Sequence, residues 1–159
     1  MKSIPYAFGV VAPASHLIAF RSKMSGYSYL LDDGRLAQGS EPPVGTKLPF
    51  DVVVLAAIEY QPESLPGHLT LHAPLDDSGP PPTPTERALI KYAAKDVARR
   101  VRAGQRVLVT CHQGRNRSGV IAGLALVELG VSGKEAAKRI RRLRNGLTNR
   151  YFYEMVVSA

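Results

Sequence analysis

Val107–Gly119, V-L-V-T-C-H-Q-G-R-N-R-S-G, holds the single cysteine of the 159-residue chain, Cys111. The apolar, β-branched residues 107–109 predict a buried strand, and the almost wholly apolar run 120–129 predicts a buried helix. The polar residues between them, with Gly114 near their middle, predict a tight loop. The sequence therefore predicts a strand, a loop and a helix N-terminus in this order.

This order of elements suits anion binding and activation of a thiol. Backbone N–H groups of a curled loop and of a helix N-terminus bind anions, and such surroundings lower a cysteine pKa from about 8.5 to about 3.5–7.5. Arg117 offers a planar fork of donors for two phosphate oxygens. An inert core cysteine is the alternative, but the polar neighbours of Cys111 disfavour it. The pattern therefore predicts phosphoryl transfer to sulfur.

The residues Cys111–Ser118, C-H-Q-G-R-N-R-S, resemble the C-x5-R-[ST] signature loop of the cysteine-dependent protein tyrosine phosphatase superfamily. The resemblance spans residues 36–152 and is closest to the compact dual-specificity branch, because residues 39–51 show no extra aromatic loop. It implies Cys111 as nucleophile and Ser118 as hydrogen-bond donor to the leaving sulfur. It also implies that the phosphate is bound by His112, Gln113, Gly114, Arg115, Asn116 and Arg117.

The proton for the leaving oxygen is expected from the segment Pro74-Leu-Asp-Asp-Ser-Gly-Pro. A positioned acid contributes on the order of 10²–10⁴ in rate. Asp76 and Asp77 are both candidates from the residues alone. The family pattern Pro-x-x-Asp favours Asp77, with Asp76 second. No cofactor is expected, and the four histidines lack the spacing of a metal site.

Two features depart from the family. Thr110 stands where relatives commonly carry a histidine beside the cysteine, which leaves the degree of thiol activation open. No second cysteine can trap an oxidised Cys111 as a disulfide, so peroxide is expected to carry it beyond sulfenic acid irreversibly.

The expected function is a phosphomonoester hydrolase, a protein tyrosine or dual-specificity phosphatase acting on a phosphorylated protein or another anionic phosphoester. Two other enzymes stay open. Gly114–Gly119 is similar to a branch that removes phosphates from RNA 5′ ends, but no aromatic platforms for RNA bases are evident. Inositide phosphatases carry extra basic residues in this loop. A non-catalytic phosphate-binding module ranks low, because both the cysteine and the arginine are present.

The composition and length of the chain indicate its class of partner, its compartment and its domain organisation. The net charge of +8 favours anionic partners, and a single cysteine fits a reducing, cytoplasmic compartment. The length fits one catalytic domain, residues 26–159, preceded by an N-terminal extension, residues 1–25. That extension is broken by Pro5 and Pro13, so we expect no membrane span, and a secretory signal is a minor alternative.

The rest of the chain predicts an α/β fold with a central, mostly parallel sheet of about five strands flanked by helices on both faces. Asp-Gly at 33–34 predicts a hairpin between 27–31 and 35–38. Apolar runs predict strands at 51–57, 68–73 and 106–110. Thr83 and Ser132, each followed three residues later by Glu, predict capping boxes, and a last helix is expected at 149–157.

Overall fold

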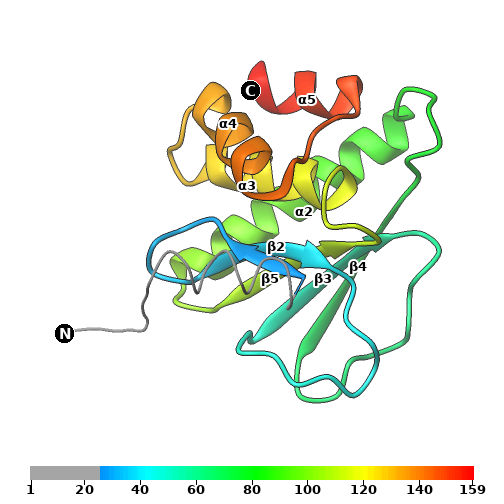
Figure 1. Ribbon diagram of the computed structural model, residues 1–159, viewed down its shortest axis with the longest axis vertical. Helices are drawn as coiled ribbons and strands as arrows, with labels where there is room; N and C mark the ends of the chain where they lie inside the picture. Colours follow the sequence, from blue (N-terminus) through cyan, green and yellow to red (C-terminus); the bar gives the residue numbers. More distant parts are fainter. Residues whose placement is uncertain (1–25) are drawn as a thin grey trace.

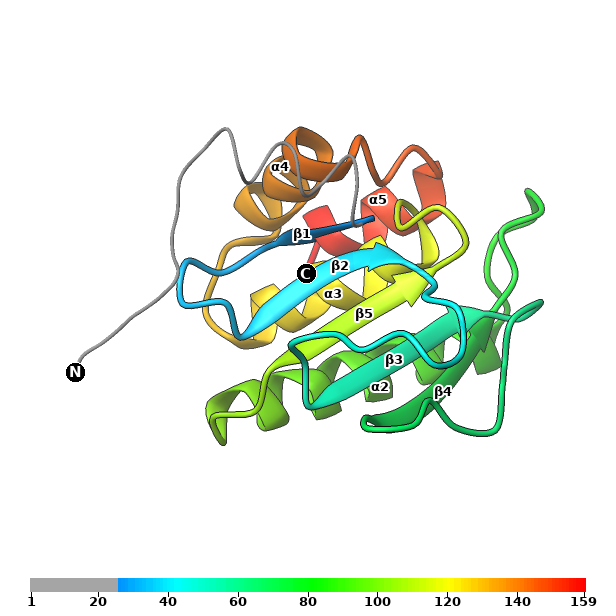
Figure 2. The ribbon, with the colours of Figure 1, turned by 60° about the horizontal axis from the view of Figure 1, so that its bottom comes forward.

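The computed structural model describes residues 26–159 as a five-stranded sheet with four helices (Figures 1 and 2). The expected extension, residues 1–25, lies outside the described residues. The strands stand in the order β1-β2-β5-β3-β4. Only β1 is antiparallel to its neighbour, so the prediction of a mostly parallel sheet is confirmed. The strands are β1 (Tyr27–Tyr29), β2 (Leu36–Ser40), β3 (Val52–Ala57), β4 (Leu69–Leu75) and β5 (Val107–Cys111).

The two central strands, β3 and β5, are apolar on both faces because both faces are covered. One face forms the larger core with the helices and includes Val54 and Val109. The other face, with Val53 and Leu108, packs against Phe50 and other residues of the connections between strands.

Helices on both faces were predicted, and for the described residues this is wrong. The described helices all lie on one side of the sheet (Figure 2). The physical reason is that residues 41–51 and 58–68 connect their strands without a helix, and these proline-containing loops cover the other face.

The helices are α2 (Pro84–Arg102), α3 (Arg117–Glu128), α4 (Gly133–Arg144) and α5 (Arg150–Val157). Thr83 caps α2 with the complete predicted capping box. The Thr83 hydroxyl accepts from the N–H of Glu86, and the Glu86 carboxylate accepts from the N–H of Thr83. Ser132 caps α4 through the N–H of Glu135, but the Glu135 carboxylate pairs with Arg139. The second capping box is therefore only half formed.

The sheet order places the sequence-predicted residues at one edge. Parallel strands β4 and β5 both end there, so the loops that follow Leu75 and Cys111 leave the sheet side by side (Figure 2). Within residues 26–159 no helix is long and apolar enough to cross a membrane. The same residues contain no cluster of His, Cys, Asp or Glu suited to a metal ion.

Candidate active site

Cys111 is the last residue of β5, and its thiol lies at the base of a loop that leads into α3. Only 3% of its surface is exposed. Its Sγ lies 3.2 Å from the Oγ of Ser118, a residue in the first turn of α3 that is fully buried. The strand, loop and helix predicted from the sequence are therefore present, with the helix beginning at Arg117 rather than at residue 120.

The loop at 112–116, here called the cysteine loop, is held by its carbonyl oxygens. Arg144 of α4 donates to the carbonyls of Gln113 (3.2 Å) and Gly114 (3.1 Å). Gln38 of β2 donates to the carbonyls of Gly114 (3.1 Å) and Arg115 (3.4 Å). Leu147 N–H also donates to Arg115 O, at 3.2 Å.

These contacts decide where the N–H groups of the loop point. In a trans peptide the N–H of the next residue points opposite to the carbonyl. Because the carbonyls of residues 113–115 are bound from outside the loop, the N–H groups of residues 114–116 are directed to its inner side. They form a concave set of donors suited to phosphate oxygens.

Gly114 is the residue that lets this loop curl. Its φ of +67° lies in the left-handed region, where a side chain is strained. A Cβ on Gly114 would lie 2.4 Å from the carbonyl carbon of Gly39 in β2 and 2.6 Å from a guanidinium nitrogen of Arg144. Both the conformation and the close packing therefore require glycine here.

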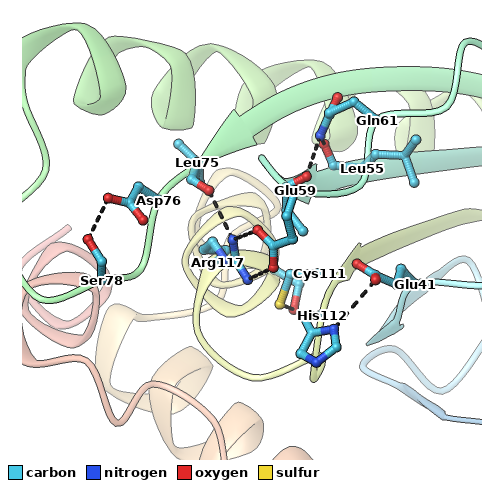
Figure 3. A network of polar contacts seen from close by, with 12 residues as sticks. Glu41, Leu55, Glu59, Gln61, Leu75, Asp76, Ser78, Cys111, His112 and Arg117 are labelled. Atoms are coloured by element: carbon cyan, nitrogen blue, oxygen red, sulfur yellow. Dashed lines mark hydrogen bonds and ion pairs between the residues drawn. The ribbon is translucent and has the colours of Figure 1, made fainter.

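Arg117 lies beside the sulfur with its guanidinium buried against Glu59 (Figure 3). Two of its nitrogens reach the two Glu59 carboxylate oxygens at 2.6 and 2.8 Å, and one also donates to Leu75 O at 3.1 Å. The hydrogen bond from Arg117 lowers the pKa of Glu59 to about 2. The Nε of Arg117 is buried and has no partner among the described residues, and the nitrogen that contacts Glu59 at 2.8 Å has a second N–H, so two donors are left for an incoming anion.

A cavity of about 260 Å³ opens above the sulfur. It is lined by Glu59, Asp76, Asp77, Ser78, Cys111, His112, Gln113, Arg115, Asn116 and Arg117. Both candidate acids therefore face the same cavity as Cys111. The Asp76 carboxylate accepts a hydrogen bond from Ser78 at 2.6 Å and is exposed, whereas Asp77 is half-buried.

Asn149 connects the two loops that line the cavity. Its side-chain amide donates to Asp77 Oδ1 at 2.7 Å, and its Oδ1 caps α5 by accepting from the N–H groups of Tyr151 and Phe152. Its backbone N–H donates to Asn116 of the cysteine loop at 3.0 Å. Asn149 thus positions a candidate acid, Asp77, relative to the cysteine loop.

The remaining loop residues differ in their surroundings. His112 is exposed, with Nδ1 3.4 Å from a carboxylate oxygen of Glu41. The side chain of Arg115 is exposed at the cavity. Thr110, which replaces the family's histidine, is buried and donates to Val54 O at 2.8 Å. Its hydroxyl is therefore used to hold β5 to β3.

No protein-family model and no curated protein matches the chain, but solved structures do. A mutant form of Tk-PTP is 28% identical, and the match covers 80% of this chain and 91% of that one, with a TM-score of 0.65. Human DUSP28 is 23% identical over 81% and 88%, with a TM-score of 0.66. PTPMT1 in complex with PI(5)P is 19% identical over 83% and 92%, with a TM-score of 0.63.

The chain has the dual-specificity phosphatase fold. The resemblance to the cysteine-dependent protein tyrosine phosphatase superfamily, inferred from the C-x5-R-[ST] loop, is confirmed at this level. The match to Tk-PTP also supports the prediction of a phosphomonoester hydrolase of the protein tyrosine phosphatase type.

Several residues that support this phosphatase-like site were not singled out for it from the sequence: Gln38, Glu59, Arg144 and Asn149. Each acts through a contact with a residue at least 30 positions away. A lone polar residue within an apolar strand, as at Gln38 between Ala37 and Gly39, is the one signal that could have marked one of these four residues.

The charge of Arg144 is affected by its position behind the cysteine loop. Burial lowers the pKa of Arg144, while a Cys111 thiolate opposes that shift.

Proposed function

We propose that the protein hydrolyses phosphate monoesters through a cysteinyl-phosphate intermediate, as a protein tyrosine or dual-specificity phosphatase. The observation that carries this proposal is the juxtaposition of Cys111 and Arg117 beneath the inward-directed N–H groups of the cysteine loop. A thiolate nucleophile and donors for three phosphate oxygens are the two requirements of such a transfer.

In the first step the Cys111 thiolate attacks phosphorus, an S–P bond forms and the P–O bond to the leaving group breaks. The electron pair of that bond stays on the leaving oxygen, which takes a proton from the acid. Asp77 is our choice for this acid, because Asn149 fixes its Oδ1 and leaves Oδ2 for the proton. Asp76 is the second candidate, since it lines the same cavity.

In the second step a water oxygen attacks phosphorus and transfers a proton to the Asp77 carboxylate. The S–P bond breaks, its electron pair returns to sulfur, and inorganic phosphate leaves. Ser118, 3.2 Å from the sulfur, stabilises the departing thiolate by a hydrogen bond. Arg117 holds phosphate oxygens in both steps, with Glu59 fixing its guanidinium.

The substrate we favour is a phosphorylated protein in a reducing, cytoplasmic compartment, where the thiol stays active. A substrate with more than one phosphate, such as an inositide or an RNA 5′ end, is the second candidate. The exposed Arg115 at the cavity and the net charge of +8 favour it. Rates on phosphopeptide, 5′-triphosphate RNA and inositol phosphate at one salt concentration separate these readings.

The first experiment is hydrolysis of p-nitrophenyl phosphate at mildly acidic pH with EDTA present. The wild type is compared with Cys111→Ser, which keeps the size of the side chain but not the thiolate. Turnover by the wild type and its loss in the variant are expected. A folded wild type that hydrolyses none of the substrates above would overturn the proposal and favour a phosphate-binding module.

A further inference from the structure

We propose that Gln38 is a positioning residue that aims the hydroxyl proton of Ser118 at the sulfur of Cys111. Gln38 lies on β2, is fully buried and is not itself one of the residues that line the cavity, although its amide contacts the carbonyl of the lining residue Arg115. This inference rests on the proposed function, because it assigns a role within the same reaction.

The orientation of the Gln38 amide follows from its neighbours. Its nitrogen lies 3.1 Å from Gly114 O, 3.4 Å from Arg115 O and 3.1 Å from Ser118 Oγ. Two of these three atoms are carbonyl oxygens, which can only accept hydrogen bonds. An amide turned by 180° would bring its own oxygen against them, so the nitrogen must face the loop.

This orientation decides the direction of the hydrogen bond between Ser118 and Cys111. A serine hydroxyl has one proton to donate and two lone pairs to accept with. Because Ser118 Oγ accepts from Gln38, its proton is left for the sulfur 3.2 Å away. The relay therefore runs from the amide to the hydroxyl and from the hydroxyl to the thiolate.

The relay matters most when the intermediate breaks down. As water attacks phosphorus, the S–P bond breaks and its electron pair becomes a thiolate charge on sulfur. A hydroxyl that is already aimed at the sulfur stabilises this charge without reorientation, which is the electrostatic advantage of a preorganised donor. Without Gln38, the Ser118 hydroxyl can turn away from the sulfur.

The loss of stability caused by a buried polar side chain at position 38 also indicates a functional role for Gln38. The Oε1 of Gln38 is buried and has no partner among the described residues. An unsatisfied buried acceptor destabilises a protein, and an aliphatic residue would fill the same space without that loss. Leu36 and Ala37, its neighbours on β2, are both apolar. A polar residue that breaks the local pattern at some cost is the mark of a functional constraint.

The test is a double-mutant cycle of Gln38→Met and Ser118→Ala on p-nitrophenyl phosphate. Methionine keeps the shape of glutamine and removes the donor. Each single variant is expected to lower kcat about tenfold or more, through slower breakdown of the intermediate, so that a burst of p-nitrophenol appears before a slow steady state. The double variant is expected to be no slower than Ser118→Ala alone, because both changes remove one relay.

Gln61→Met is the matched control. The Gln61 amide nitrogen also donates to two backbone carbonyls, those of Leu55 (3.0 Å) and Ala57 (2.8 Å), and its Oε1 is also buried without a partner among the described residues. It makes no contact with Ser118, so it shares the structural role of Gln38 but not the relay. No burst is expected in this variant.

Alkylation of Cys111 by iodoacetamide as a function of pH gives a readout that needs no turnover. The acidic limb of the plot of alkylation rate against pH is expected to move to higher pH in Gln38→Met and in Ser118→Ala, but not in Gln61→Met. Additive losses in the cycle, or a wild-type alkylation profile in Gln38→Met, would overturn the relay. A wild type that shows this alkylation pattern but hydrolyses no phosphoester would instead refute the proposed function.

If Gln38→Met does not fold, the Gln38 side-chain amide signals can be followed by NMR in the wild type and in Ser118→Ala. They are expected to shift when the acceptor Oγ is removed. Unchanged signals would contradict the hydrogen bond on which the relay depends.

Discussion

The cysteine loop and the loop at 76–83, here called the acid loop, line one cavity but are supported very differently. The cysteine loop is clamped through three successive carbonyls by β2, α4 and the residues before α5. The acid loop is mostly exposed, carries three successive prolines at 80–82, and is tied to the body of the protein at Asp77 by Asn149.

This difference assigns different tasks to the two loops. The proposed nucleophile and phosphate donors gain from being fixed before the substrate arrives, because any reorganisation would add to the barrier. An acid must meet leaving groups of different shapes, and a lightly held segment can adjust to them. The two loops should therefore respond differently to matched substitutions.

The largest loss of activity is expected when a glycine in the left-handed region is replaced. Each loop has one such glycine, Gly114 in the cysteine loop and Gly79 in the acid loop. In the cysteine loop, Gly114→Ala drives a Cβ against the Gly39 backbone at 2.4 Å. We expect kcat/KM to fall about 10³-fold, because several phosphate donors are displaced together. The free energy of unfolding should fall by about 1–3 kcal/mol.

Gly79→Ala in the acid loop is the matched control for Gly114→Ala. Gly79 has a φ of +125°, but a Cβ there would meet nothing within 4 Å. Only backbone strain remains, of about 1–2 kcal/mol, and an exposed loop can relax it. Steady-state kinetics and urea denaturation of both variants measure the contrast, and equal losses of activity would contradict it.

The next effect concerns which aspartate supplies the proton. Asp77→Asn is expected to lower kcat on phosphotyrosine peptide about 10²-fold, and less on p-nitrophenyl phosphate, whose leaving group needs no proton. The fall of kcat on the alkaline side of the pH profile should also disappear, since that limb reports loss of the acid proton. Asp76→Asn should stay close to wild type on both substrates. If the two variants exchanged these behaviours, Asp76 would be the acid.

A smaller effect is expected from the anchor of the acid loop. Asn149→Ser keeps an N-cap for α5 but removes the amide that reaches Asp77, so kcat should fall about tenfold with little loss of stability. Asn149→Ala should lower kcat similarly and also cost about 1 kcal/mol of stability, because the cap is lost. Comparing kcat with thermal unfolding of the two variants separates positioning from capping. Wild-type kcat in Asn149→Ser would show that Asp77 needs no anchor.

The smallest expected effect is a loss of stability when Glu59 is replaced. The bond to Arg117 lowers the Glu59 pKa in the folded protein from 4.5 to about 2. The stabilisation is therefore complete above about pH 5 and is lost as the pH falls through about 2. Because the Glu59 side chain is 49% exposed, Glu59→Gln should cost no more than about 1 kcal/mol at neutral pH. Urea denaturation from neutral to acidic pH should show this difference narrowing, and a constant difference would contradict the charge-based origin.

Local features made much of the fold predictable from the sequence. The continuous apolar runs marked β3 and β5, the Asp-Gly turn marked the β1–β2 hairpin, and the Thr83 cap marked the start of α2. The cysteine loop was equally visible, because its residues are consecutive. The helices were placed on both faces because alternating elements favour that arrangement, whereas two connections turned out to contain no helix.

The supports of the site could not be predicted in the same way. Glu59 reads as part of a polar connection, and Arg144 reads as one more cation of the basic α4. Their roles arise only when the sheet order brings β2, β3 and α4 around one loop. A partner 58 or 30 residues away leaves no pattern in a single sequence.

The same long-range clamping makes the proposed activity a reporter of complete folding. The contact from Gln38 to the cysteine loop spans 76 residues of chain, and the contact from Arg144 spans 30 in the other direction. A contiguous fragment must run at least from Gln38 to Arg144 to contain both residues that hold the cysteine loop. A folding intermediate that lacks either β2 or α4 therefore leaves the loop without one of these two supports. During refolding, enzymatic activity should therefore return with the slowest structural signal and not with early sheet formation.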